Sequence, residues 1–390
     1  MNFVFFSPHF PGSSGEFAIR LHEEGATVLG IGDAAYDDLP ERLRGALTEY
    51  YRVDNMENQD ETLRAVGYFT HQYGKIDRFE SMNEYWLESD AQMRTDFNID
   101  GTKADFVDNL KQKSKMKDFF RKSGVDTVRF LKNPDRISAA AFIAENGFPV
   151  VVKPDLGSGA SHTYKLSDQE ELDYFLHTRP ADTEFIMEEF IDGIILTYDG
   201  IIDHEGIVRF QASHRFEQSI MKVVSDDDHL RYFCLKNVDP EVEKAGRSIL
   251  EAFGIRERFF HIELFKSNKN GRLIALEVNM RPPGAWMTDA INYSYEVDVY
   301  SLWARTVVHG GSGAPPEGRY FTGYASRKDR KHYVHSHEDI LRELGDAVVR
   351  YDEIDAIFSR ASGNRAYQFR ADSLDRVREI ADYIQAVDHG

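Results

Sequence analysis

Hydrophobic and polar positions in the first quarter of the chain alternate between two patterns. Residues 2–7, 26–31 and 76–81 are short apolar runs with the length and composition of strands. Residues 16–24 and 83–94 carry apolar positions at the spacing of amphipathic helices. Strands that alternate with helices are typical of a parallel, doubly wound sheet. The beginning of the chain is therefore predicted to form a Rossmann-like domain.

The pattern changes after this region. Residues 111–122 form a basic amphipathic helix pattern that ends at Gly124, a residue suited to a left-handed helix end. Residues 194–210 and 259–278 each read as strand, turn and strand, which predicts two hairpins. The stretch 310–318, rich in glycine and proline, separates a last segment with a strand and a C-terminal helix. We expect an α+β region followed by a small α+β segment.

Composition and charge narrow the classes of protein that fit. The chain has 390 residues, enough for two or three domains, and an ordinary globular balance of 42% hydrophobic and 29% charged residues. No apolar run approaches the ~20 residues of a membrane-spanning helix, and the first residues lack the features of a signal peptide. A single cysteine, Cys234, excludes an internal disulfide. A cytoplasmic location is the default expectation, without a membrane partner.

The net charge is −19, which argues against a nucleic-acid partner, because phosphate neutralisation needs a basic surface. A basic cluster at residues 327–332 has two interpretations, a solvated charge run or a contact with phosphate or a partner. An acidic protein that binds a phosphorylated ligand must gather its positive charge locally. Isolated lysines in apolar surroundings are therefore the residues to locate.

Three polar residues, Glu277, Asn279 and Arg281, alternate along one apolar strand and so share one of its faces. Carboxylate and amide oxygens suit Mg²⁺, and an arginine can hold an anion through two hydrogen bonds. Burial of three unpaired polar groups would be costly. A solvated edge strand would show the same pattern, so this segment alone leaves both interpretations open.

The strand at residues 261–265 is the predicted hairpin neighbour of this segment, and it carries Glu263 among apolar and aromatic residues. Neighbouring strands lie about 4.8 Å apart, which would bring Glu263 next to Glu277. Two such carboxylates repel each other unless a cation lies between them. The pair therefore predicts a metal site. His261 is expected to be a packed residue, and no function is assigned to it.

Positive charge enters at Lys153, which follows the apolar run at residues 148–152. A lysine at the end of a buried strand usually has an anionic partner. The loop at residues 157–161 has glycines and small residues whose backbone amides could bind phosphate, although flexible surface turns look alike. The strand at residues 185–191 combines apolar residues with two carboxylates, a pattern that could bind adenine through its backbone and ribose through a carboxylate.

In this order, over about residues 1–310, these motifs resemble the ATP-grasp superfamily of carboxylate–amine (or thiol) ligases, including biotin-carboxylase-like and L-amino acid ligase-like members. The resemblance implies an α/β and α+β chain with the ATP-grasp fold, in which two α+β lobes sandwich ATP. It divides the chain into a Rossmann-like pre-ATP-grasp domain at 1–110, an ATP-grasp domain at 111–310 with a mobile lid lobe at about 125–192, and a C-terminal α+β subdomain at 311–390.

The resemblance also implies residue functions. The expected ATP-binding residues are Lys113, Lys153, Gly157, Ser158, Gly159, Ala160, Ser161, Glu188, Glu189, Phe190 and Ile191. The expected metal ligands are Glu263, Glu277 and Asn279, and the expected catalytic residues are Arg281 and Lys222. Lys113 and Lys222 could instead be exposed lysines. Ile195 stands where the family often has an acidic residue, which puts the ribose or phosphate contacts made there in doubt.

The activity implied is an ATP-dependent, ADP-forming ligase. With Mg²⁺, or Mn²⁺ in its place, a substrate carboxylate would become an acyl phosphate that an amine then attacks to form an amide. An amino acid or a small peptide is the expected substrate, and a homodimer is a further option. The loops at residues 9–10 and 83–86 could line the acceptor side or could be ordinary loop packing. The alternatives are an ATP-grasp kinase, a biotin-carboxylase-like enzyme and a non-catalytic ATP-binding regulatory protein.

Overall fold

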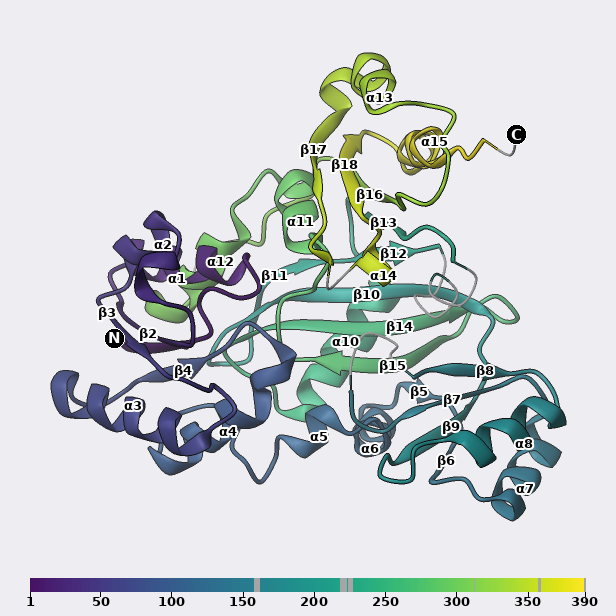
Figure 1. Cartoon of the computed structure of the whole chain (residues 1–390), viewed down its shortest axis with the longest axis horizontal. Helices are drawn as coiled ribbons and strands as arrows, with labels where there is room; N and C mark the ends of the chain where they lie inside the picture. The colour runs from purple at the N-terminus through teal and green to yellow at the C-terminus, as the bar shows by residue number, and fades with distance from the viewer. Residues whose placement is uncertain (158–161, 218–222, 224–226, 312, 357–358, 389–390) are drawn as a thin grey trace.

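Three β-sheets organise the chain, and helices cover their faces (Figure 1). The computed structural model describes residues 1–157, 162–217, 223, 227–311, 313–356 and 359–388. The sheets contain four, ten and four strands. None of the helices in this described part is both long and apolar enough to cross a lipid bilayer.

The first sheet is parallel, as the alternation of strands and helices predicts. Its strands lie in the order β3 (Glu49–Arg52), β2 (Thr27–Gly32), β1 (Asn2–Phe6) and β4 (Arg78–Glu80). Phe3 and Phe5 of β1 pack on one face with α1 (Ser14–Glu23) and α12 (Val299–His309). Val4 and Phe6 pack on the other face with helices that include α3 (Gln59–Tyr73) and α4 (Leu87–Asp96). Both faces are thus buried, which explains why the strand is apolar throughout.

The second sheet carries the predicted metal strands near one of its edges. In spatial order it comprises β17 (Val348–Glu353), β18 (Arg365–Ala371), β16 (Phe321–Arg327), β13 (Arg231–Cys234), β12 (His214–Phe216), β10 (Gly193–Ile202), β14 (Arg258–Ser267), β15 (Leu273–Asn279) and β5 (Asp126–Thr127), while β11 (Val208–Ala212) pairs with β10. Both predicted hairpins, β10–β11 and β14–β15, are present. The strands near the C-terminus continue this sheet through β13 and β16. The division at residue 310 therefore does not separate one sheet from another.

The third sheet is antiparallel and is the smaller lobe at the lower right of Figure 1. Its strands are β6 (Phe130–Lys132), β9 (Phe185–Glu189), β7 (Val150–Pro154) and β8 (Tyr164–Leu166), and α7 (Arg136–Asn146) and α8 (Gln169–Thr178) lie with them. Val150, Val152 and Met187 share a core with Leu172 of α8. This lobe holds the strand that ends near Lys153 and the strand that contains Glu188.

The helix predicted at residues 111–122 is interrupted. The chain forms α5 (Asp108–Lys111) and α6 (Lys113–Ser123), which meet at Gln112 in an extended conformation. Gly124 ends α6 with a φ of 75°, as predicted. Sequence reasoning missed α10 (Pro240–Phe253), although its ends carry clear signals: Asp239 caps the helix, Pro240 begins it, and a left-handed Gly254 ends it.

Buried ions join the first sheet to the second. Glu80 of β4 accepts a hydrogen bond from Arg258 of β14, and Arg94 of α4 lies 3.0 Å from the same carboxylate. All three side chains are nearly buried. Asp90 lies 3.7 Å from Arg94, and burial raises the pKa of Asp90 to about 6 despite that arginine. Removing one member of such a set leaves a charge that water cannot reach.

Replacement of Arg258 by Met is expected to lower the free energy of unfolding by about 3 kcal/mol, because Glu80 would lose a buried partner. Urea unfolding followed by circular dichroism measures this change. The exposed Arg256→Met variant is the control, with an expected change below about 0.5 kcal/mol. Equal stability of the two variants would show that the Glu80 cluster contributes little to joining the sheets.

Candidate nucleotide and metal site

Glu263 and Glu277 are direct cross-strand partners in the β14–β15 hairpin. A register shift follows Glu263, so the pair lies at a local irregularity of the ladder. Asn279 is nearly buried two residues further along β15. The structure thus brings the three predicted metal ligands together, because the short turn after β14 sets the register of the hairpin.

The two carboxylates have pKa values shifted in opposite directions. Burial raises the pKa of Glu277, the charge of Glu263 adds to this, and Lys113 opposes it. Burial also acts on Glu263, but a hydrogen bond and the charge of His261 lower its pKa below the usual range. A cation between the two carboxylates would favour the charged form of both.

The donor set fits a hard divalent cation. Two carboxylates and one amide oxygen are hard ligands of the kind that Mg²⁺ accepts, with water and phosphate oxygens completing its octahedron. Among the residues that the structure describes, no group of three or more His, Cys, Asp and Glu side chains is arranged to hold a metal. An ion held by Glu263, Glu277 and Asn279 would have room for water and phosphate oxygens as further ligands, as is typical of magnesium bound with a nucleotide.

Two predicted nucleotide lysines pair with predicted site carboxylates. Lys113 begins α6, and its Nζ lies 3.5 Å from Glu277 and donates a hydrogen bond to the carbonyl of Gly157. Lys153 lies on β7, with its Nζ 2.7 Å from Glu188. Both side chains are nearly buried. Lys113 thus contacts one metal strand directly, and the charge of Lys153 acts on both Glu263 and Glu277.

Lys117 is a further buried cation that sequence reasoning missed. Its side chain is 0% exposed, and its Nζ lies 2.8 Å from Glu188. Burial alone would raise the pKa of Glu188, but Lys117 and Lys153 outweigh it and hold that pKa at about 2. The sequence signal that could have identified Lys117 is its spacing, because it follows Lys113 by four residues and so shares its helix face.

Asp155 attaches the helix of these lysines to the strand of Lys153. Its carboxylate accepts hydrogen bonds from the Ser114 backbone at 2.7 Å and from the Ser114 hydroxyl at 2.6 Å. The backbone N–H of Lys113 donates to the Asp155 carbonyl at 3.0 Å. These bonds satisfy the otherwise unpaired donors at the start of α6.

Of the other residues expected to bind ATP, four lie outside the described part of the chain, whereas the structure describes Gly157. Ser158, Gly159, Ala160 and Ser161, together with the expected catalytic Lys222, lie outside the described residues. Gly157 has a φ of 121°, a conformation that favours glycine.

The strand predicted to bind adenine and ribose has side-chain partners within the protein. Glu189 lies 2.7 Å from Arg129, and the Phe190 ring lies 4.4 Å from the Lys165 Nζ. Ile191 is half-buried directly after Phe190. Adenine and ribose binding by these residues stays a prediction, and Glu188 in particular has lysines as its partners.

Arg281 lies two residues beyond β15 and reaches toward the first domain. Its Nη2 and Nε lie 3.0 and 3.3 Å from Oε2 of Glu84. Glu84 begins the short 3₁₀ helix η2 (Glu84–Trp86).

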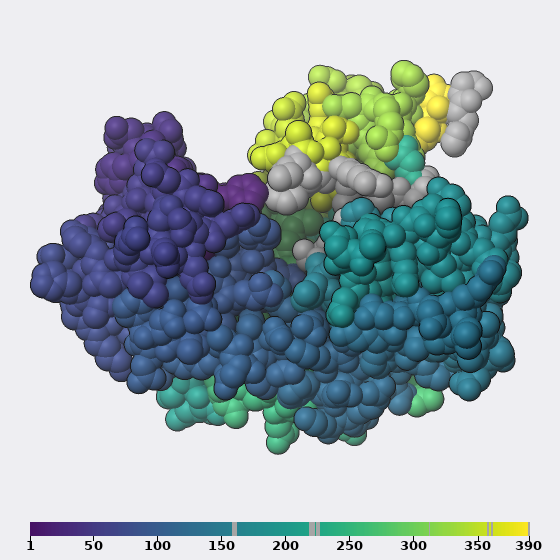
Figure 2. Space-filling view, turned by 60° about the horizontal axis from the view of Figure 1, so that its bottom comes forward, coloured from purple at the N-terminus to yellow at the C-terminus, as the bar shows by residue number. Residues whose placement is uncertain are grey.

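Figure 2 shows a recess between the purple N-terminal residues, the teal third sheet and the yellow C-terminal residues.

His261, to which sequence reasoning assigned no function, connects a buried network to the metal strands. Its Nδ1 lies 2.5 Å from Asp199, and its Nε2 lies 3.2 Å from Glu263. His214 contacts the same Asp199 at 2.7 Å. Burial lowers the pKa of His261, but Asp199 and Glu263 outweigh it and raise the value to about 9. The imidazole thus orients Glu263 from two residues earlier on the same face of β14.

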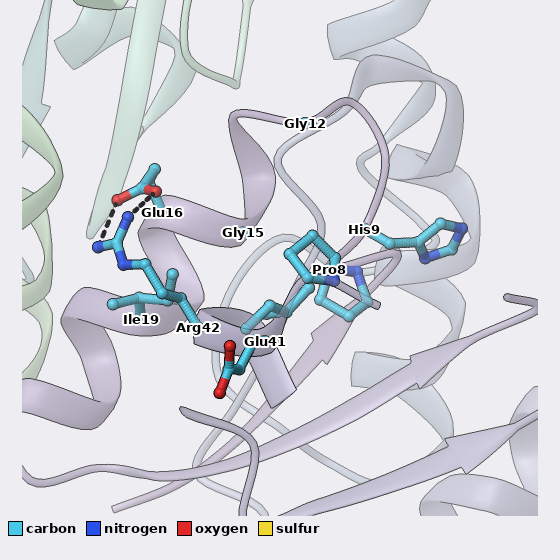
Figure 3. A pocket seen from close by; sticks show the side chains of 10 residues that line it. Pro8, His9, Gly12, Gly15, Glu16, Ile19, Glu41 and Arg42 are labelled. Carbon is cyan, nitrogen blue, oxygen red and sulfur yellow. Dashed lines mark hydrogen bonds and ion pairs between the residues drawn. The ribbon is translucent and has the colours of Figure 1, made fainter. Parts of the chain in front are cut away.

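A cleft of about 240 Å³ lies elsewhere, in the first domain. Figure 3 shows it between the loop after β1 and the start of α1, with the Glu16–Arg42 ion pair at its side. Its lining residues are Pro8, His9, Gly12, Gly15, Glu16, Ile19, Pro40, Glu41, Arg42 and Leu43. None of the expected nucleotide or metal residues is among them, so this cleft is distinct from the candidate site.

Comparison with known proteins identifies the fold. The sequence model of the ATP-grasp domain matches residues 146–289. The L-amino acid ligase of Bacillus licheniformis has a similar structure, with a TM-score of 0.73 and 17% identity over 100% of this chain and 98% of that one. The N5-carboxyaminoimidazole synthetase of Staphylococcus aureus in complex with ADP has a TM-score of 0.70 at 13% identity, covering 97% and 95% of the two chains.

The chain has the ATP-grasp fold, which confirms the predicted fold class, and the match of residues 146–289 to the ATP-grasp domain agrees with the resemblance inferred from its motifs. At the level of sequence it is similar to the L-arginine-specific L-amino acid ligase of Bacillus subtilis, with 24% identity over 242 residues. That match covers 59% of this chain and spans 56% of the relative's length.

Replacement of Lys117 by Met is expected to weaken Mg-ATP binding about 10- to 50-fold. Glu188 would keep its negative charge with one lysine fewer, and one uncompensated charge near the phosphates opposes binding by about 2 kcal/mol, the order of an ion–ion interaction at an effective dielectric of about 20. Isothermal titration calorimetry with Mg-ATP measures the change. Lys115→Met, on the exposed side of the same helix, is the control. Equal affinities of the two variants would contradict this electrostatic function of Lys117.

Proposed function

We propose that this protein is an ATP-dependent, ADP-forming carboxylate–amine ligase that acts on an amino acid or a small peptide. The observation that carries the proposal is the cross-strand pair of Glu263 and Glu277, with Lys113 and Arg281 beside it. The similarity to two L-amino acid ligases supports the substrate class. Small-molecule partners follow from it, whereas the three-domain division and a homodimer stay predictions.

Glu263, Glu277 and Asn279 would hold Mg²⁺, or Mn²⁺ in its place. When bound, the ion neutralises charge on the β- and γ-phosphates of ATP. Glu263 is oriented by His261 at 3.2 Å, so one ligand is positioned before any ion arrives. Glu277 is 3.5 Å from Lys113 and would exchange part of that contact for the ion.

The lysines supply the remaining positive charge. Lys113 and Lys153 would offset the α- and β-phosphates, and Lys117 would keep Glu188 paired while Lys153 turns to the nucleotide. Burial of these cations makes each contact stronger than it would be in water. The expected phosphate loop at residues 157–161 would cover the phosphates and exclude water from the site.

The reaction would proceed in two steps. A substrate carboxylate attacks the γ-phosphorus of ATP, giving an acyl phosphate and ADP. The amine then attacks the acyl carbon, phosphate leaves, and an amide remains after the amine loses its proton. Arg281, and Lys222 as the sequence suggests, would stabilise negative charge on the acyl group through both steps.

ADP release by the purified protein with Mg-ATP, against amino acids supplied singly and in pairs, tests this function. We expect release that requires a carboxylate and an amine, with one amide formed per ADP. Replacement of Glu277 by Gln is expected to lower kcat about 100- to 1,000-fold, because charge stabilisation at the phosphates is lost. Glu205→Gln, in the exposed turn after β10, is the control.

The outcomes of this assay separate the alternatives. Transfer of phosphate to a hydroxyl would indicate a kinase, and bicarbonate-dependent ADP release would indicate biotin-carboxylase-like chemistry. Binding of ATP without turnover under all pairings would favour a regulatory ATP-binding protein. Normal turnover by Glu277→Gln would contradict the proposed metal site.

The metal dependence gives a second prediction. Replacement of Asn279 by Ala is expected to raise the Mg²⁺ concentration at half-maximal ADP release about 10-fold or more, since one oxygen ligand is lost. Titration of Mg²⁺ at saturating ATP after removal of metal by a chelator measures this value. An unchanged half-maximal concentration would exclude Asn279 from the ligand set.

A further inference from the structure

The Glu84–Arg281 ion pair joins an acid of the first domain to an arginine of the candidate site. The two hydrogen bonds from Arg281 to Glu84 converge on one oxygen, Oε2, while Nη1 of Arg281 donates to the Pro282 carbonyl. The side chain of Glu84 is 12% exposed, so its charge is largely withdrawn from bulk water. Asn83 accepts a hydrogen bond from the Tyr85 backbone at 3.0 Å and fixes the turn that presents Glu84.

The contact between the domains does not require this pair. The buried Glu80 cluster with Arg94 and Arg258 already joins the first sheet to β14. A continuous apolar core that includes Phe5, Phe17 and Phe259 also crosses the boundary. An extra buried ion pair adds little stability on average, because desolvation offsets its attraction. The position of Glu84 therefore calls for another explanation.

The pair lies beside the predicted metal ligands. The charge of Arg281 helps to lower the pKa of Glu263, and the charge of Glu84 helps to raise the pKa of Glu277. ATP and a substrate carboxylate are both anionic, so the negative charge of Glu84 at the reacting end of their site would repel both. It favours a substrate that also carries a positive charge close to its carboxylate.

We propose that Glu84 binds the α-ammonium group of an α-amino acid whose carboxylate is the group activated by ATP. This inference rests on the proposed ligase function and specifies its carboxylate substrate. In an α-amino acid the ammonium nitrogen is two bonds from the carboxyl carbon, so its opposite charges lie side by side. Glu84 and Arg281 present the complementary charges 3.0 Å apart.

Substrate binding would exchange ion pairs without stranding a charge. Arg281 would leave Glu84 for the substrate carboxylate, and the substrate ammonium would replace Arg281 on Glu84. A carboxylate without an amino group would take Arg281 and leave Glu84 buried without a partner. Such an unpaired group costs more than the lost contact itself, which is how a polar site rejects an analogue.

The test compares amino acids with their desamino analogues, such as alanine with propionate, in carboxylate-dependent ADP release. We expect the wild-type protein to prefer the amino acid in kcat/KM by at least about 10-fold. Glu84→Gln is expected to reduce this preference about 10- to 100-fold, mainly through KM of the amino acid, with KM of ATP unchanged. Glu88→Gln, a nearby acid with a 56% exposed side chain, is the matched control and should keep the preference.

Each outcome is decisive for one of the two proposals. Equal loss of kcat/KM for the amino acid and its analogue in Glu84→Gln would overturn the inference and make Glu84 a residue that only positions Arg281. A wild-type protein that uses both compounds equally would overturn it as well, while leaving the ligase function intact. A wild-type protein that releases no ADP with any carboxylate would contradict the ligase function itself.

Glu84→Asp keeps the charge on a shorter side chain, and it provides the same comparison if Glu84→Gln is unstable. It is expected to retain the preference for the amino acid with a raised KM. Loss of the preference in Glu84→Asp, at a melting temperature equal to that of the wild type, would contradict recognition by charge.

Discussion

Two carboxylates on neighbouring strands impose the main electrostatic constraint on this molecule. Glu263 and Glu277 face each other in the β14–β15 hairpin, and both are largely buried. Nearby cations balance their repulsion, because burial removes most of the water that would screen it. Lys113 lies 3.5 Å from one carboxylate, and His261 lies 3.2 Å from the other. Although the net charge of the chain is −19, positive groups thus gather beside these two carboxylates.

Cations also pair with buried carboxylates outside the β14–β15 hairpin. Lys117 and Lys153 both form ion pairs with Glu188, and Arg281 forms an ion pair with Glu84. In each case a carboxylate holds a cation for which we propose a contact with the phosphates or the acyl group, namely Lys153 or Arg281. Burial lowers the pKa of Lys117 and Glu188 opposes that effect, while the carboxylates fix where the cations point. Preorganised charges also cost no reorganisation when the reaction occurs.

Local sequence patterns predicted much of this architecture. The apolar run of β1, the helix end at Gly124 and the turn between β14 and β15 each depend on residues within a few positions of one another. Such local signals also placed Glu263 opposite Glu277, because hairpin register follows from a short turn. The helix α10 was missed even though Asp239, Pro240 and Gly254 mark its ends.

The sequence by itself thus determined the parallel first sheet and the two hairpins of the second sheet, and it predicted the residues of the candidate metal site. Only the tertiary structure decided that Lys117 joins Lys153 on Glu188, that His261 supports Glu263, and that Glu84 meets Arg281 across 197 positions of the chain. The physical reason is distance along the chain. Periodicity reports which face of an element a side chain occupies, whereas the partner across a domain boundary depends on how whole sheets pack.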